Sequence, residues 1–241
     1  MGIKGEADLS AIGRLIGEPP RARALMALSD GRQLPASMLA VEAGVAASTM
    51  SGHLARLVDG GMITVRQHGR YRYYQLAGPH IAELVEVLAR VAPTLAITSL
   101  REGTRAHAIR RARRCYDHMG GRIAVAITDS LRGHGYLDGH DGTADLAPGA
   151  YTLTPDGAAF LQEHGIALAA YSAVRCCVDW TEQRHHAGGI LGRELLAAFE
   201  QRDWIKPAGA PRALTLTGQG HAAIEAVFEI DLTDPARSAT P

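Results

Sequence analysis

The stretch at residues 44–76, GVAASTMSGHLARLVDGGMITVRQHGRYRYYQL, constrains the fold of this chain more than any other. It predicts a turn, a helix, a strand, a tight turn and a second strand. Apolar residues in its first half recur near the 3.6-residue period of a helix, and Gly60-Gly61 supplies the glycine that commonly ends one. Two β-rich runs, 62–65 and 71–76, then flank a predicted hairpin tip at residues 67–70.

The predicted helix carries short polar groups opposite its apolar side, and the predicted hairpin is rich in arginine. These polar and basic residues are Ser48, Thr49, Ser51, His53 and Arg56 on the helix, and Arg66, Arg70 and Arg72 on the hairpin. A small polar helix face followed by a basic two-stranded ribbon suits the major groove of duplex DNA and the backbone beside it. The alternative is an ordinary helix and hairpin inside an enzyme.

Composition sets wider limits. With 241 residues, 46% of them hydrophobic, the chain can form one large domain or two of ordinary size. No apolar run approaches the roughly 18 residues of a membrane span, and charged residues interrupt the N-terminus where a signal peptide would be apolar. Three cysteines, two of them adjacent, do not make an extracellular disulfide framework. We therefore expect a soluble cytoplasmic protein without a membrane partner. The net charge is zero, but the basic residues are concentrated locally.

Three short helices are predicted before this stretch, at residues 9–17, 21–28 and 36–43, and Gly44 provides the turn of a helix-turn-helix. Residues 9–76 resemble the ArsR/SmtB family of bacterial winged helix-turn-helix repressors. The residues that carry the resemblance are Ala46-Ala47-Ser48-Thr49-Met50-Ser51-Gly52-His53-Leu54, Leu57, Gly60-Gly61-Met62-Ile63, Arg66, Gly69-Arg70 and Tyr73-Tyr74-Gln75-Leu76. The resemblance implies a winged helix-turn-helix DNA-binding domain at residues 1–77.

The resemblance also implies roles for single residues. Ser48, Thr49, Ser51 and His53 would face base edges and phosphates, and Arg56 would contact a phosphate. Arg70 and Arg72 would contact the backbone or the minor groove beside the wing. His53 has a second interpretation, in which its ring packs beneath the helix instead of touching DNA.

The sensing sites best known in this family are missing. Metal-sensing members carry a Cys-x-Cys pair in the helix before the turn, but residues 35–40 contain no cysteine. Their other common site pairs carboxylates and histidines along the dimer helix, where residues 79–92 offer only His80, Glu83 and Glu86. We expect no metal regulation at these two places, and no cofactor is needed for DNA binding itself.

Residues 78–114 are predicted to form a linking and dimerisation segment of one or two helices, with a kink or restart at Pro93 and with Leu95, Ile97 and Leu100 continuing it. A homodimer is expected because one recognition helix reads too few base pairs, and two must lie about one DNA turn apart. The basic run at residues 101–114 either reaches DNA phosphates or is a solvated link between domains.

The remaining residues, 115–241, extend beyond the short family members and contain an apparent duplication, 115–170 and 177–230. The string HMGGRI at residues 118–123 aligns without gaps on HAGGIL at residues 186–191, and YTLTPDG at 151–157 corresponds to LTLTGQG at 214–220. Each repeat reads as a helix and a wing. The predicted fold is therefore mainly α with small antiparallel β wings (α+β): an N-terminal winged helix-turn-helix, a long linking/dimerisation helix, and a C-terminal duplicated helix–wing domain.

A related short string precedes the Gly-Gly of each repeat, and it pairs Cys115 with Cys177 and Asp117 with Asp179. Duplicated halves tend to pack about a pseudo-twofold axis, which would bring the two strings together. The predicted effector-binding residues are Cys115, Tyr116, His118, Cys176, Cys177, Trp180, His185 and His186. Three chemistries suit this set: a thiolate–imidazole site for a soft or borderline metal ion, a thiol switch, or a pocket for a small organic effector.

In a purely structural alternative, the cysteines are small buried hydrophobes, and Asp117 and Asp179 are helix caps or partners of Arg122 and Arg184. No motif of a phosphate-binding loop, serine hydrolase or zinc protease occurs, so we expect no catalytic residues and no enzyme. The sequence predicts a homodimeric transcriptional repressor whose binding to double-stranded DNA is modulated by a metal or small-molecule effector at the C-terminal domain. The alternatives are a redox- or metal-responsive switch that uses Cys115, Cys176 and Cys177 with the same DNA head, or a ligand-free DNA binder of low specificity.

Overall fold

The computed structural model describes residues 6–140 and 150–233. It mixes helices and strands, with about half of the chain helical. The chain divides into two compact units, Met1–Val85 and Glu86–Pro241, which we describe separately. No helix in the described part of the chain has both the length and the apolar character to cross a membrane.

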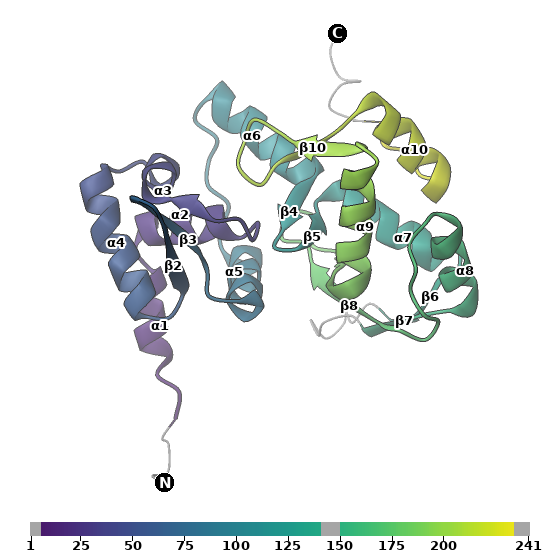
Figure 1. Cartoon of the computed structure of the whole chain (residues 1–241), viewed down its shortest axis with the longest axis horizontal. Coiled ribbons are helices and arrows are strands. Elements are labelled where there is room, and N and C mark those ends of the chain that lie inside the picture. Colours follow the sequence, from purple (N-terminus) through teal and green to yellow (C-terminus); the bar gives the residue numbers. More distant parts are fainter. Residues whose placement is uncertain (1–5, 141–149, 234–241) are drawn as a thin grey trace. The chain divides into compact units, whose positions relative to one another are not determined.

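The first unit has the element order of a winged helix-turn-helix (Figure 1). Its elements are α1 (Leu9–Ile16), α2 (Pro19–Leu28), β1 (Leu34–Pro35), α3 (Ala36–Ala43), α4 (Ala47–Asp59), β2 (Ile63–His68) and β3 (Tyr71–Leu76). The three strands form one antiparallel sheet in the order β1-β3-β2.

Helix α4 is placed by its apolar stripe and by the turn before it. Gly44 ends α3 in the left-handed conformation, with φ of 69°, which a residue with a side chain adopts only at a cost. Met50, Leu54 and Leu57 are completely buried where α4 packs on α2 and α3. Because these three residues occupy one side of the helix, its polar side is left to solvent.

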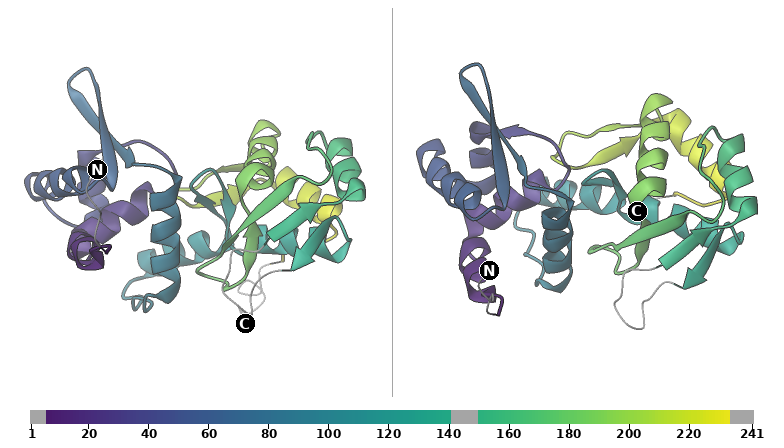
Figure 2. Two further views of the ribbon diagram at one scale, coloured as in Figure 1. Left: turned by 90° about the horizontal axis from the view of Figure 1, so that it is seen from below. Right: turned by 60° about the horizontal axis from the view of Figure 1, so that its bottom comes forward.

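The hairpin of β2 and β3 is longer than the sequence predicted. Strand β2 continues to His68, which pairs with Tyr71, so the tip is reduced to Gly69 and Arg70. Gly69 has a positive φ of 59°, as a tight hairpin turn requires. Figure 2 shows this hairpin extending away from the helices of its unit as a narrow ribbon.

The predicted linking segment is two helices, α5 (Pro79–Val91) and α6 (Leu100–Arg111). The prediction that Leu95 and Ile97 continue the first helix is wrong, because no helix is present between Val91 and Leu100. Pro93 accounts for the break, since a proline cannot donate the backbone hydrogen bond that the interior of a helix needs.

The second unit contains the same order of elements twice: strand, strand, helix, strand, strand, helix. The first series is β4 (Arg113–Cys115), β5 (His118–Gly120), α7 (Arg122–Gly133), β6 (Leu137–His140), β7 (Ala150–Leu153) and α8 (Pro155–Glu163). The second series is β8 (Ala173–Val178), β9 (His185–Ala187), α9 (Gly189–Gln201), β10 (Ile205–Pro207), β11 (Leu214–Leu216) and α10 (Gly218–Phe228).

The two series are interleaved. The β6–β7 hairpin of the first joins the β8–β9 hairpin of the second in a four-stranded antiparallel sheet. The second series also contacts the first elsewhere, because the backbone N–H of Leu214 in β11 donates to the carbonyl of Ala112, just before β4, at 2.9 Å. Helix α9 packs on β5, and helix α7 packs on β9. Because elements of each series pack on the other, the first hairpins of the two series, β4–β5 and β8–β9, are in contact at the centre of the unit.

Candidate functional site

The polar side of α4 is open to solvent. Ser48, Thr49, Ser51 and Arg56 are all exposed, while the apolar stripe on the opposite side of the helix is buried. The Ser51 hydroxyl donates to the carbonyl of Ala47 at 3.0 Å, so it is held close to the helix backbone. The small side chains leave this surface without bulky projections, as close approach to a base edge requires.

His53 is placed differently from these residues. It is half-buried, and its Nδ1 lies 3.4 Å from a guanidinium nitrogen of Arg21, a buried residue of α2. Since a guanidinium can only donate, this contact directs the ring toward the helices beneath α4. The same guanidinium donates to the carbonyls of Arg14 and Leu15, and so connects α1 to α2 and α4.

The hairpin carries its arginines on an exposed ribbon. Arg66, Arg70 and Arg72 are exposed, and every residue of β2 after Ile63 is exposed as well. The Arg70 guanidinium lies 5.3 Å from the centre of the Tyr71 ring, which leaves its charge at the tip of the hairpin.

The second unit brings four predicted effector residues together. They are Cys115, His118, Cys177 and His186, which we call the Cys–His cluster, and their Sγ and ring nitrogen atoms all lie within 4.8 Å of one another. Cys115 and His118 are cross-strand partners in the β4–β5 hairpin. Cys177 and His186 are cross-strand partners in the β8–β9 hairpin. Each hairpin therefore supplies one sulfur and one imidazole.

The two imidazole rings face each other across the cluster. Their Nε2 atoms are 3.1 Å apart, while each Nδ1 faces a carboxylate. His118 Nδ1 lies 3.0 Å from Asp117, and His186 Nδ1 lies 3.4 Å from Asp179. Cys115, His118 and His186 are buried, and Cys177 is partly buried.

The electrostatics of the cluster favour a charged pair. A hydrogen bond from Cys177, and then the neighbouring histidines, hold the pKa of the Cys115 thiol well below its usual value. The pKa of Cys177 is raised correspondingly by its hydrogen bond to Cys115 and by burial. Burial lowers the pKa of His118, but the Cys115 sulfur and Asp117 more than offset it and raise that pKa to about 9. The site thus stabilises a thiolate in a buried position.

Asp179 links the cluster to a buried network of charges. Its carboxylate accepts from the backbone of Gly121 at 2.6 Å and lies 3.0 Å from the Arg113 guanidinium. Arg113 also lies 3.3 Å from Glu86, and it is completely buried. Although burial opposes it, Arg113 and then His186 lower the pKa of Asp179 below its ordinary value.

These contacts correct two expectations. Asp179 pairs with Arg113 instead of Arg184, whose partner is Asp129 at 2.7 Å. Asp117 pairs with His118, and its second cation is Arg193 at 3.7 Å, not Arg122. Arg113, predicted within a run that reaches phosphates or is solvated, instead has no exposed surface.

The other four predicted effector residues lie outside the cluster. Cys176 belongs to the apolar core, where burial raises the pKa of its thiol to about 12. Trp180 lies over the Arg113 guanidinium at 5.1 Å. His185 is likewise not among the grouped ligand atoms. Tyr116 lies in the turn between β4 and β5. Successive side chains on a strand point to opposite faces, so Cys176 and His185 cannot share the face of Cys177 and His186.

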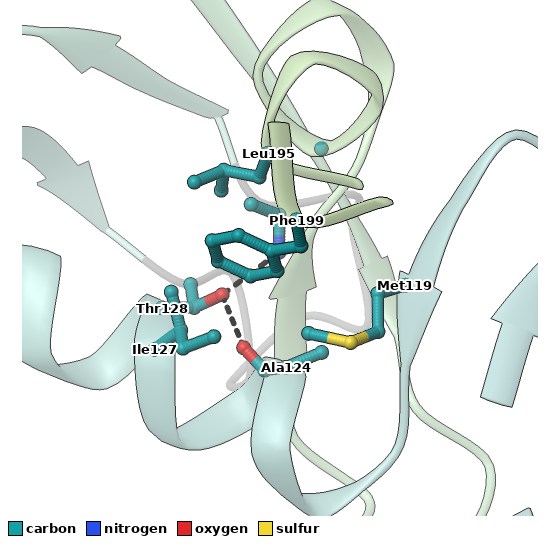
Figure 3. Close-up of a pocket in the computed structure, with 8 residues that line it drawn as sticks. Met119, Ala124, Ile127, Thr128, Leu195 and Phe199 are labelled. Atoms are coloured by element: carbon teal, nitrogen blue, oxygen red, sulfur yellow. Dashed lines mark hydrogen bonds between the residues drawn. The ribbon is translucent and has the colours of Figure 1, made fainter. Parts of the chain in front are cut away.

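An apolar cavity lies next to the cluster but is too small for an organic effector. Its volume is about 10 Å³, which is room for one water molecule. Met119, Ile127, Thr128, Leu195 and Phe199 are among the residues around it (Figure 3). The Thr128 hydroxyl there donates to the carbonyl of Ala124 and accepts from the backbone of Ala187, which joins α7 to β9.

Gly120 and Gly188 contribute to the site but were not predicted there, although each belongs to the Gly-Gly pair of its repeat. A Cβ on Gly188 would lie 3.2 Å from Nε2 of His118 and 3.3 Å from Sγ of Cys177. A Cβ on Gly120 would lie 3.2 Å from Asp179 and 3.3 Å from the ring of His186. Each glycine leaves room for cluster residues, including those of the other hairpin.

Comparison with known proteins gives one relative that spans nearly the whole chain and another that spans about a third of it. A protein of Bacillus subtilis (strain 168) described as an uncharacterized HTH-type transcriptional regulator, YdfF, is 35% identical over 223 residues, covering 90% of this chain and 96% of the relative. The HTH-type transcriptional regulator CmtR of Mycobacterium tuberculosis is 38% identical over 90 residues, covering 36% of this chain and 75% of CmtR. No model of a protein family matches the chain.

Solved structures align with about a third of the chain. Reduced HlyU from Vibrio cholerae is 22% identical with a TM-score of 0.33, covering 36% of this chain and 90% of HlyU. The cadmium metal-sensor CmtR from M. tuberculosis is 32% identical with a TM-score of 0.31, covering 37% of this chain and 93% of CmtR.

Proposed function

Because the chain belongs to the HTH-type transcriptional regulators, with an ArsR-type winged helix-turn-helix in its first third, we propose that it is a homodimeric repressor whose operator binding is modulated at its second unit. The observation that carries the DNA-binding part is the exposed polar face of α4 together with the exposed arginines of the wing. A helix reads base edges, and cations on a ribbon bind phosphates without reading sequence.

Exposed apolar side chains support the homodimer. Leu9 on α1 is 78% exposed, and Val87 and Val91 on α5 are 44% and 71% exposed. Leu95 and Leu100, after α5, are exposed as well. Apart from Leu9, this apolar surface lies on the segment predicted to join two subunits, and it fits burial against a second copy of the chain. Two copies would place two recognition helices on adjacent turns of one DNA face.

The effector site of the proposal is the second unit, which we infer to be a duplicated domain. The repeated order of elements and the exchange of hairpins and helices between the two series support the duplication. The Cys–His cluster lies where the two series meet. An effector changes DNA binding only if it binds more tightly to one of two conformations that differ in DNA affinity. The geometry of a site at the junction between two halves can differ between such conformations.

Three substitutions test the DNA head. First, operator duplexes are selected by the full-length protein from a pool of random sequence. Arg70→Ala should then weaken binding to every duplex and reduce the slope of log affinity against log salt by about one, because one phosphate contact is lost. Lys206→Ala, which removes an exposed cation of the second unit, is the matched control and should leave both unchanged.

Ser48→Ala and Thr49→Ala should act differently, because their side chains face base edges in the proposal. Each should change which duplexes are preferred when selection is repeated, with little change in the salt slope. Equal losses on all duplexes from these two variants would contradict the assigned roles. A steep salt dependence without any sequence preference in the wild type would favour a DNA binder of low specificity.

A further inference from the structure

The Cys–His cluster has the donor set and geometry of a metal centre. We propose that Cys115, His118, Cys177 and His186 bind one Zn²⁺ ion in a closed tetrahedral site that joins the two halves of the second unit. Binding of the ion does not depend on DNA. Its role as the effector rests on the proposed function.

The distances match a tetrahedral ion. Zinc binds sulfur at about 2.3 Å and imidazole nitrogen at about 2.0–2.1 Å, which separates two nitrogens of a tetrahedron by roughly 3.4 Å and two sulfurs by roughly 3.8 Å. The two Nε2 atoms are 3.1 Å apart, and all four donor atoms lie within 4.8 Å of one another. An ion therefore fits if the donor atoms move by about 1 Å or less, mainly by closing inward around it.

The rings are already turned as metal ligands. A ligating histidine usually gives its second nitrogen to a carboxylate, which fixes the ring and raises its basicity. Asp117 does this for His118. Asp179 is placed to do so for His186, because the buried Nδ1 of His186 lies 3.4 Å from that carboxylate and makes no hydrogen bond within the described part of the chain. Both Nε2 atoms are thereby directed to the centre of the cluster.

Charge also balances at the centre. Two thiolates neutralise the two charges of Zn²⁺, and the imidazoles bind as neutral ligands. The carboxylates behind the rings have cations of their own, since Asp179 contacts Arg113 and Asp117 lies near Arg193. A buried divalent ion would thus leave no unpaired charge in the interior.

The identity of the ion follows from the donors. Two sulfurs and two imidazoles in a tetrahedron suit Zn²⁺, while magnesium and calcium require oxygen donors. Four protein ligands leave no open position for water or substrate, so the site is a structural or sensing one and not a catalytic one. The ligands come from residues 115–118 and 177–186, and a single ion would therefore connect the β4–β5 and β8–β9 hairpins.

The test uses the full-length protein, reduced and freed of metal by a chelator. Titration with Co²⁺ should give one equivalent bound, with the visible absorption of a tetrahedral ion and the near-ultraviolet band of cobalt–thiolate bonds. One equivalent of Zn²⁺ should then remove both signals. Cys177→Ser and His186→Gln should each weaken Co²⁺ binding at least about 100-fold. Cys176→Ala, which removes the adjacent thiol on the opposite face, should retain the tetrahedral spectrum.

A second measurement uses only the wild-type protein, so its result does not depend on whether the variants fold. In the wild type, Zn²⁺ should protect Cys115 and Cys177 from alkylation, as identified by peptide mass spectrometry, and should leave the rate at Cys176 unchanged. Less than half an equivalent of bound metal, an octahedral cobalt spectrum, or equal protection of all three thiols would overturn the proposal. So would a Cys115–Cys177 disulfide that forms with peroxide in protein that binds no metal.

The two proposals fail separately. Loss of metal binding in a protein that still selects operator duplexes overturns the zinc site alone. One equivalent of tightly bound zinc in a protein that binds no DNA contradicts the proposed function and leaves the zinc site standing.

Discussion

His118 and His186 present the same nitrogen to the same point because each ring has a carboxylate behind it. The carboxylates are not ligands, yet they decide the direction of the rings. A residue of this kind is hard to recognise from sequence, since nothing in the string around Asp117 or Asp179 distinguishes a carboxylate behind a ligand from a helix cap.

Asp117→Asn offers the cleaner test of this role, because Asp117 is partly exposed while Asp179 is buried among several partners. The amide cannot stabilise the ring as a carboxylate does, so metal affinity should fall about 10- to 100-fold. The tetrahedral cobalt spectrum should persist, since all four ligands remain. Competition with a chelating dye measures the affinity, and an unchanged affinity would show that Asp117 does not support the site.

From the sequence we predicted eight effector-binding residues, and the structure groups four of them. Cys115, Cys177, His118 and His186 were all expected at the site and do come together. Cys176 and His185 adjoin members of the cluster in the sequence, and the strand alternation that separates them from the cluster depends on knowing that 173–178 and 185–187 are strands. The burial of Arg113 could not be predicted for another reason, because nothing in a basic run of the sequence indicates which of its arginines is buried.

At the scale of elements, the first unit follows from local pattern. The apolar period of α4, the glycines near its two ends and the β-rich runs of the wing are all short-range signals, and the structure has the corresponding helix, turns and strands. The second unit does not follow in the same way. The repeat indicates the order of elements, but the packing of α7 on β9 and α9 on β5 is a long-range exchange that no local pattern reports.

Close packing at the junction of the hairpins makes a prediction at this scale. Gly188→Ala would place a Cβ against His118 and Cys177, so it should lower the free energy of unfolding by about 1–3 kcal/mol and weaken metal binding. Urea denaturation and cobalt titration measure the two effects. Gly133→Ala, where nothing lies within 4 Å of the new Cβ, is the control and should not destabilise the protein. Equal behaviour of the two variants would remove the argument from close packing.

For the whole molecule, the proposal requires two copies. Val91→Glu introduces a charge into the exposed apolar surface of α5 and should convert the dimer to monomers in sedimentation velocity, because burying an unpaired carboxylate is costly. Operator affinity should fall with it. Ile190→Glu, at a half-exposed apolar residue of α9, is the matched control and should remain dimeric. A monomeric wild type that binds its operator with full affinity would contradict the homodimer.

The central claim is that zinc bound at the junction in the second unit changes the DNA affinity of the winged helix-turn-helix. Its most direct test is the operator dissociation constant of the full-length protein, measured by fluorescence anisotropy at fixed salt with zinc bound and after chelation. We predict that the two constants differ by about 5- to 150-fold, the usual range of coupling between two sites, and that Cys177→Ser abolishes the difference. Equal dissociation constants for the zinc-bound and zinc-free wild type would contradict it.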